Sequence, residues 1–269
     1  MLLKPNFLLS VLKIAEQAGE YLNHFYARKL QIRKKLDNTP VTEADLFISQ
    51  FLIQKLSNLT PKIPILSEES SYISLKEREG WKTYWLIDPL DGTQQFINRT
   101  GQFAVMISLI QDHRPVLGII HCPIQQLTYY AIQGQGSYKQ SNLKLIKLSP
   151  HFIDFERPIR IAVGSTKAEH KVRLILNPNY SYDFHICGAS GLKGCLVAEG
   201  VVDCYVRIGE TGEWDTAAAE IILTEIGGGI FDSHFQPLTY NQRNSLINPD
   251  FVMVGYSQLD WRKIFQFNL

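Results

Sequence analysis

The sequence of 269 residues is poor in cysteine and has no long apolar run. Its four cysteines (Cys122, Cys187, Cys195 and Cys204) show no Cys-x-x-Cys spacing and lie among apolar or small residues. We therefore expect free thiols that pack in the core of a protein from a reducing compartment. The seven histidines form no His-x-His or His-Glu-x-x-His pattern, which argues against a zinc site. No segment approaches the ~20 apolar residues that a membrane-spanning helix needs.

The sequence also lacks an excess of charge of either sign. The 27 lysines and arginines balance 26 aspartates and glutamates, so the formal net charge is +1. This balance gives no general attraction to nucleic acid or to acidic membranes. No basic pattern interleaved with aromatic residues, typical of a nucleic-acid interface, is present. We therefore expect no nucleic-acid partner.

The N-terminal segment predicts an amphipathic helix. Residues 1–19 carry one early lysine, a broken apolar pattern and acids soon after, unlike a secretory signal peptide. The expected location is therefore the cytoplasm, and peripheral attachment to the inner membrane through this helix is an alternative. A homodimer is also compatible with the sequence, which shows no internal repeat and no low-complexity tract.

The apolar pattern predicts an α/β protein built from two lobes. The first, residues 1–158, has an α+β pattern: helices are expected at 6–26 and 43–58, followed by strands at 84–87, 103–110, 116–121 and 127–132. Their short connections favour an antiparallel meander. In the second, residues 159–269, strands at 159–163, 182–186, 204–206 and 252–255 alternate with helices at 167–176, 190–199 and 215–226. Such alternation is typical of an α/β lobe.

The most informative segment is Asp88-Pro89-Leu90-Asp91-Gly92-Thr93, directly after the apolar run 84–87. Two carboxylates three residues apart, with a carbonyl between them, can face one hard cation, and oxygen ligands suit Mg²⁺ or Mn²⁺. The glycine allows close backbone approach, and the threonine begins a helix whose free N–H groups can bind phosphate. The segment predicts a combined metal and phosphate site. The alternative is a solvated turn, which is typical of an isolated Asp-x-x-Asp.

Three further acids could complete this site. Glu68 follows the short apolar stretch 63–67, although paired glutamates are also common on surface loops. Asp215 begins a helix, either as a partner of the helix dipole or as part of a crowded site beside the neighbouring tryptophan. Asp45 comes three residues after Thr42, an arrangement typical of a helix cap. A structural role alone could therefore explain this aspartate.

Together these segments resemble the inositol monophosphatase superfamily of Mg²⁺-dependent, lithium-sensitive phosphatases. The likeness spans nearly the whole chain and is strongest to its bacterial 3'(2'),5'-bisphosphate nucleotidases. It runs through residues 35–45, 64–69, 84–93, 188–193, 196–200 and 213–218. It implies the layered α-β-α-β-α sandwich of this superfamily, with the site between the two lobes.

The resemblance implies a ligand set. Glu68, Asp88 and the carbonyl of Leu90 would hold a first Mg²⁺, and Asp88, Asp91 and Asp215 a second, with Asp88 bridging the two ions. A weaker third ion near Glu68 is compatible with this set, and Mn²⁺ could replace Mg²⁺.

The resemblance also implies roles for the groups around the ions. Thr93, hydrogen-bonded to Asp45, would orient the attacking water and take its proton. The backbone N–H groups of Gly92 and Thr93 would meet the phosphate.

Substrate choice rests on a second group of residues. Ser190 and Lys193 lie in a segment similar to the Gly-Ser-Ser-Leu-Lys motif of the nucleotidases. Lys193 or Arg207 could engage the second phosphate of adenosine 3',5'-bisphosphate, unless Lys193 simply lies exposed on a helix. The chain departs from the pattern at residues 94–95, two glutamines in place of Lys-Glu, and at Gly191, which replaces a serine.

The predicted activity is Mg²⁺-dependent hydrolysis of the 3'-phosphate of adenosine 3',5'-bisphosphate to AMP and phosphate, which would clear a by-product of sulfur assimilation. The first alternative is an inositol monophosphatase or broad sugar phosphatase with the same metal site. The second is a non-catalytic metal- or nucleotide-binding regulator, which the complete set of acids and the threonine disfavour.

Overall fold

The computed structural model describes residues 5–29, 31–34, 39–142, 144–154 and 156–267. Its α-helices are α1 (Pro5–Tyr26), α2 (Glu43–Leu59), α3 (Leu75–Arg78), α4 (Thr93–Ile97), α5 (Thr166–Arg173), α6 (Ser190–Ala198) and α7 (Ala217–Thr224). Single 3₁₀ turns are η1 (Glu68–Ser70), η2 (Glu213–Asp215) and η3 (Trp261–Lys263). A small hairpin pairs β1 (Ile32–Lys34) with β2 (Pro40–Thr42).

The remaining strands form two sheets. The larger contains β3 (Ile65–Ser67), β4 (Thr83–Asp91), β5 (Ala104–Gln111), β6 (Arg114–Cys122), β7 (Leu127–Ile132), β8 (Gly136–Ser141) and β9 (Leu145–Lys147), in sequence order. The smaller contains β10 (Ile159–Val163), β11 (Tyr182–Ile186), β12 (Cys204–Arg207), β13 (Gly229–Asp232) and β14 (Phe251–Val254), in the order β11-β10-β12-β14-β13.

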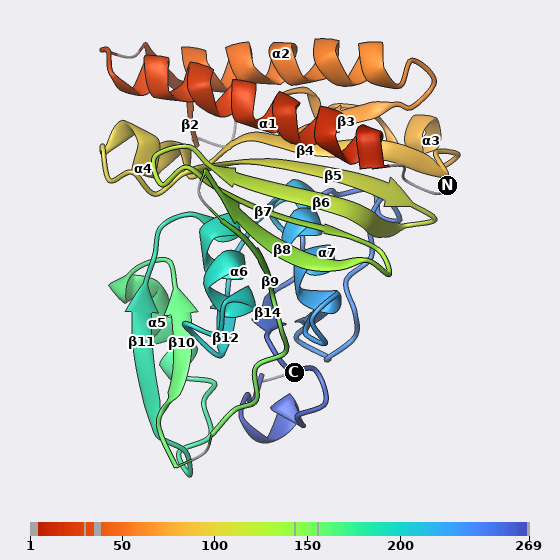
Figure 1. Ribbon diagram of the computed structural model, residues 1–269. Coiled ribbons are helices and arrows are strands. Elements are labelled where there is room, and N and C mark those ends of the chain that lie inside the picture. Colours follow the sequence, from red (N-terminus) through yellow and green to blue (C-terminus); the bar gives the residue numbers. More distant parts are fainter. Residues whose placement is uncertain (1–4, 30, 35–38, 143, 155, 268–269) are drawn as a thin grey trace.

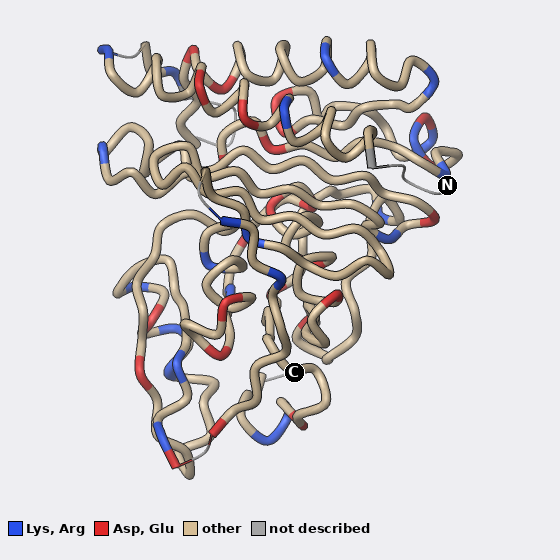
Figure 2. Tube along the Cα trace, viewed as in Figure 1, with Lys and Arg blue, Asp and Glu red and all other residues tan. Residues whose placement is uncertain are grey.

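The elements stack in five layers (Figure 1). Helices α1 and α2 cover the outer face of the larger sheet, α6 and α7 lie between the two sheets, and α5 packs on the smaller sheet. This α-β-α-β-α arrangement confirms the expected fold class. Acidic and basic residues are spread over both halves of the chain, the part up to residue 158 and the part after it (Figure 2).

The larger sheet is the expected antiparallel meander from β4 to β9, with β3 added in parallel to β4. The strand β4 is longer than the expected range 84–87, and Asp88 and Asp91 lie within its last four residues. The pairing of β4 with β5 shifts between these two residues. Pro89 lies in this irregularity, because a proline cannot donate a ladder hydrogen bond.

Helix α1 is amphipathic, as the sequence of the N-terminal segment predicts, and its apolar face packs on the larger sheet. Val11, Ala15, Ala18 and Leu22 share one face of the helix and are fully buried in a core with the outer face of the larger sheet. No helix in the described part of the chain is both long and apolar enough to cross a bilayer.

Helix α7 joins the two halves of the chain. The helix begins at Ala217, so Asp215 lies in the 3₁₀ turn before it. The expectation that Asp215 lies in the first turn of the α-helix was therefore wrong. The helix packs against β6 at Gly118, where a Cβ would lie 2.5 Å from Ile221 Cγ2 and 2.7 Å from the carbonyl oxygen of Ala218. The missing side chain on β6 thus lets α7 approach the sheet.

The four cysteines are free and buried, as expected. The segment between β9 and β10 connects the two sheets, but α6 and α7 share one core with strands of both. A division of the chain into lobes at residue 158 therefore stays a prediction.

Candidate metal and phosphate site

Three carboxylates meet where the chain's two halves touch. One oxygen each from Asp88, Asp91 and Asp215 lies within 4.8 Å of the others. The first two come from the end of β4 and the third from η2, which packs against β4. Asp88 and Asp91 are buried and Asp215 is half-buried. All donors are oxygens, so the set fits a hard divalent cation.

These three aspartates are largely shielded from water, and their negative charges repel one another. Burial is the main cause that raises the pKa of each, and for Asp215 it raises the pKa to about 8. The charges of Glu68, Asp91 and Asp215 raise the pKa of Asp88 further. A bound cation would relieve this repulsion.

Backbone N–H groups hold Asp91 in place. The N–H of Ser190 donates to its Oδ1 at 3.0 Å and the N–H of Gly191 to its Oδ2 at 2.6 Å, both from the start of α6. A Cβ at position 191 would lie 2.9 Å from Met106 Sδ and 3.1 Å from Asp91 Oδ2. The glycine that departs from the family pattern is thus suited to this close approach.

The loop that carries Asp215 is anchored by buried polar contacts. The N–H of Gly212 donates to Asp215 Oδ2 at 2.6 Å. The next residue, Glu213, is fully buried and accepts from the N–H of Asn241 at 2.8 Å. The guanidinium of Arg78, also fully buried, donates to Asn241 Oδ1 at 2.6 Å. This chain of contacts ties η2 to the end of α3.

Thr93 and Asp45 form a hydrogen-bonded pair beside the acids. The Thr93 hydroxyl lies 2.9 Å from Asp45 Oδ1 and 3.2 Å from the carbonyl oxygen of Leu90. Asp45 Oδ2 accepts from the N–H of Thr42 at 2.7 Å and from its hydroxyl at 2.6 Å. The expected capping role of Asp45 is therefore present together with the contact to Thr93. Burial raises the pKa of Asp45, against the lowering effect of the Thr42 and Thr93 hydrogen bonds.

Glu68 begins η1 directly after β3 and lines the same cavity as Asp91 and Asp215. Gly92 has φ of +88°, and a Cβ there would lie 2.8 Å from the carbonyl oxygen of Gln102. The chain therefore needs glycine at this position to turn from β4 into α4.

The cavity beside the acids has a volume of about 360 Å³. Both halves of the chain contribute to its lining, with Thr39, Pro40, Glu68, Asp91, Gly92, Thr93 and Gln94 from the first and Gly188, Ser190, Lys193, Tyr205, Arg207, Glu210, Thr211, Gly212, Trp214, Asp215 and Ile247 from the second. Of the candidate site residues, only Asp45, Asp88 and Leu90 are absent from this lining, and all three are buried.

Lys193 lies deeper than its place on a helix suggested. It is 2% exposed, and its ammonium donates to the carbonyl oxygens of Cys187, Gly188 and Ala189 at 3.0, 3.1 and 2.7 Å. Burial lowers its pKa to about 8, against the raising effect of Asp91. The lysine thus brings positive charge to the cavity wall and holds the loop before α6.

Two other substrate candidates, Ser190 and Arg207, line the cavity. The Ser190 hydroxyl is buried near the Tyr205 phenol, yet its oxygen has no partner with hydrogen-bond geometry. Arg207 Nη2 donates to the carbonyl oxygen of Glu210 at 2.7 Å.

The two glutamines that replace Lys-Glu have separate surroundings. Gln94 lines the cavity, and its amide donates to Asn98 at 3.0 Å. Gln95 packs on Gly188 and accepts from the Thr100 hydroxyl at 3.0 Å.

Some cavity residues were not found from the sequence. Tyr205 lies two residues before Arg207 on β12, so strand alternation could have placed both on one face. Ile247 and Glu210 come from irregular loops, where no periodic pattern marks the direction of a side chain.

Buried carboxylates that converge next to a polar cavity, on a five-layered α/β fold, are typical of a metal-dependent phosphatase. The chain belongs to the inositol monophosphatase family, whose model matches residues 7–260.

The named relatives are similar over almost their whole length. The 3'(2'),5'-bisphosphate nucleotidase CysQ of Aggregatibacter actinomycetemcomitans is 60% identical, and that of Haemophilus influenzae 57%, each over 99% of both chains. The crystal structure of CysQ from Bacteroides thetaiotaomicron superposes with a TM-score of 0.75 at 30% identity, covering 92% of this chain and 96% of the other.

Proposed function

We propose that this protein is a 3'(2'),5'-bisphosphate nucleotidase that hydrolyses adenosine 3',5'-bisphosphate to AMP and phosphate. The convergence of Asp88, Asp91 and Asp215 beside a polar cavity carries the proposal. The relatives of 57–60% identity that bear this name support the choice of substrate.

Mg²⁺ is the proposed cofactor, as two ions with a weaker third, and Mn²⁺ as a substitute. Glu68, Asp88 and the Leu90 carbonyl would hold the first ion, and Asp88, Asp91 and Asp215 the second. Bound ions of this kind neutralise phosphoryl oxygens and make a water more acidic. The raised pKa values of the three aspartates support a cation at this place.

Thr93 and Asp45 are proposed to orient the attacking water and to remove its proton. A hydroxyl that donates to the Asp45 carboxylate presents its lone pairs to the cavity, where it can accept a hydrogen bond from water. Because burial raises the pKa of Asp45, this carboxylate can receive a proton more readily than an exposed aspartate. The backbone N–H groups of Gly92 and Thr93 are proposed to bind the departing phosphate.

The second phosphate of the substrate is proposed to lie near Ser190, Lys193 and Arg207. The unpartnered Ser190 hydroxyl and the two basic side chains on one wall favour an anion there. Since the Lys193 ammonium already donates to three carbonyls, it would act mainly through its charge, and Arg207 would lie at the wall beside it.

The test is phosphate release with Mg²⁺ from adenosine 3',5'-bisphosphate and, in parallel, from inositol 1-phosphate. We expect a strong preference for the nucleotide. A preference for inositol phosphate would keep the metal site and overturn the substrate. No release from either by a folded protein that binds Mg²⁺ would favour a regulator.

A second comparison separates the two phosphates. Arg207→Met should raise KM for adenosine 3',5'-bisphosphate but leave KM for adenosine 3'-monophosphate unchanged, because the monophosphate lacks the group that the arginine is proposed to bind. Equal changes for both substrates would contradict this role.

A function in sulfur assimilation, a cytoplasmic location, peripheral attachment to the inner membrane, a homodimer and the absence of a nucleic-acid partner stay predictions.

A further inference from the structure

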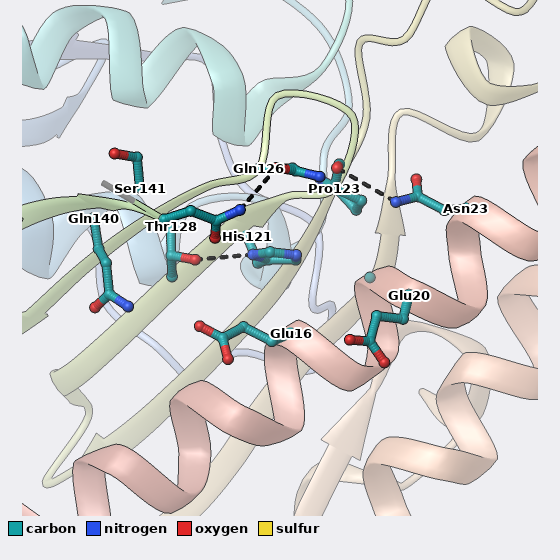
Figure 3. A pocket seen from close by; sticks show the side chains of 11 residues that line it. Glu16, Glu20, Asn23, His121, Pro123, Gln126, Thr128, Gln140 and Ser141 are labelled. Atoms are coloured by element: carbon teal, nitrogen blue, oxygen red, sulfur yellow. Dashed lines mark hydrogen bonds between the residues drawn. The ribbon is translucent and has the colours of Figure 1, made fainter. Parts of the chain in front are cut away.

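A second polar cavity lies between α1 and the turn that joins β6 to β7 (Figure 3). It has a volume of about 230 Å³ and shares no lining residue with the cavity at the acids. Its lining consists of Glu16, Gly19, Glu20, Asn23, His121, Pro123, Gln126, Thr128, Gln140, Ser141 and Asn142. No lysine or arginine is among these residues, so the cavity offers acceptors and negative charge.

The acids come from one face of α1. Glu16, Glu20 and Asn23 are spaced by four and three residues, which places their side chains on the same side of the helix. Neither glutamate forms an ion pair or hydrogen bond within the part of the chain that the structure describes. Their charges are therefore available to a ligand.

Two polar atoms in the wall, one from His121 and one from Asn23, lack a hydrogen-bond partner among the described residues. His121 is 8% exposed, and its Nδ1 lies 2.9 Å from the Thr128 hydroxyl. Its Nε2 has no hydrogen bond to any described residue. This nitrogen points toward Glu20 and Asn23 (Figure 3). The Asn23 amide donates to the carbonyl oxygen of Pro123 at 3.4 Å, while its Oδ1 is buried without a partner. Buried polar groups of this kind are normally satisfied by a ligand or by water.

Gly19 makes room for the imidazole. A Cβ at this position would overlap the His121 ring, so the helix can only lie this close to the sheet because position 19 has no side chain. Burial lowers the pKa of His121 to about 4, so the ring carries no positive charge at neutral pH and does not oppose a cation. The charged groups that line the cavity are Glu16 and Glu20.

The spacing of these groups argues against a single metal ion. Among the described residues, the only acidic or histidine cluster with ligand atoms within 4.8 Å of one another is that of Asp88, Asp91 and Asp215. Glu16, Glu20 and His121 therefore do not converge on one point. A cavity of about 230 Å³ also exceeds the roughly 30 Å³ of one water in the liquid. The geometry suits a cation with several separated donors.

We propose that this cavity binds a small organic cation with more than one N–H donor group, of the alkyl diamine class. One ammonium would lie between Glu16 and Glu20, and the other would donate to Asn23 Oδ1 and the polar wall. Hydrogen bonds from an ammonium to a carboxylate are charge-assisted and stronger than neutral ones.

The experiment is calorimetric titration with putrescine at pH 7, about 0.15 M salt and saturating Mg²⁺, so that the acids of the first cavity are occupied. We expect one site per chain. The double variant Glu16→Gln/Glu20→Gln should bind at least about tenfold more weakly and should keep the phosphatase turnover of the unaltered protein. The control Glu77→Gln/Glu79→Gln removes the same charge from exposed positions on and next to α3 and should bind normally.

Gly19→Ala provides a separate measurement, because the added Cβ displaces His121 without changing charge. It should also weaken putrescine binding. The proposal is overturned by an absence of binding in the unaltered protein, by equal weakening in the control, or by Zn²⁺ binding that depends on Glu16 and Glu20 while putrescine does not bind.

Discussion

The two polar cavities of this protein differ in how their carboxylates are held. Asp88, Asp91 and Asp215 project from a strand end and a 3₁₀ turn, and their oxygens lie within 4.8 Å. Glu16 and Glu20 stand one turn apart on α1, half-buried and exposed. The first set concentrates negative charge in a place with little water, and the second spreads it along a helix face.

The two arrangements of carboxylates suit different kinds of ligand. Converging buried carboxylates repel one another strongly unless a cation or protons neutralise them, so their geometry indicates a metal ion. Separated carboxylates at the surface are solvated and need no ion, and the second cavity is proposed to bind a cation whose donors reach these carboxylates and other polar groups of its wall. Four predictions test whether the two cavities differ in this way.

The largest effect is expected for Asp88→Asn. This aspartate is proposed to bridge two ions, so phosphatase turnover should fall by roughly 10³-fold or more, equivalent to about 4 kcal/mol. The metal-free protein should stay folded, because the change removes a buried charge that its neighbours repel. Turnover assays and thermal unfolding measure both. Asp183→Asn, at an exposed strand position, is the control, and near-normal turnover of Asp88→Asn would contradict the ligand set.

The next effect concerns the hydroxyl of Thr93. Thr93→Val keeps the shape but removes the group that is hydrogen-bonded to Asp45, and kcat should fall by roughly 10²-fold, as for loss of a proton-transfer group. Thr93→Ser keeps the hydroxyl and should retain most of the activity. Steady-state kinetics at saturating Mg²⁺ measures kcat, and a valine variant as active as the serine variant would show that the hydroxyl has no role.

Removal of Mg²⁺ should lower the free energy of unfolding, and this effect should depend only on the acids at the first cavity. At 100 times its Kd, each bound Mg²⁺ should raise the free energy of unfolding by about 2.7 kcal/mol, because the ion binds the folded chain only. Urea unfolding with and without a chelator measures this difference. The stabilisation should vanish in Asp88→Asn and persist in Glu16→Gln/Glu20→Gln. Loss in the glutamine variant instead would place a metal in the second cavity.

The smallest effect is a pH dependence from the second cavity. The folded pKa of His121 is lowered to about 4 from its ordinary 6.5, so below pH 6.5 the unfolded chain binds the proton first. This contribution to stability is complete above pH 6.5 and is lost as the pH falls towards 4, by about 2 kcal/mol between pH 7 and pH 5. In His121→Gln the slope of unfolding free energy against pH should be smaller over this interval. An unchanged slope in urea titrations would show that the ring is not buried in its neutral form.

Much of the fold follows from local patterns. The apolar face of α1, the meander from β4 and the strand–helix alternation after residue 159 were each predicted within a few residues. Short or weakly apolar strands were missed, such as β8, β9 and β13, because they lack a distinct alternating pattern. β8 and β9 are placed by pairing with the strands next to them in the sequence, and β13 by pairing with β14.

The sequence by itself determined which chemical groups are present and in what order: carboxylates at strand and helix ends, a glycine turn followed by threonine, and cysteines suited to a core. Only the tertiary structure decided their directions and distances. Packing of η2 on β4 brings Asp215 to Asp88 and Asp91, the loop before α6 surrounds the Lys193 ammonium, and Gly19 admits the His121 ring. The physical reason is that a local pattern fixes the face on which a side chain lies, whereas contact between distant segments depends on how whole layers pack.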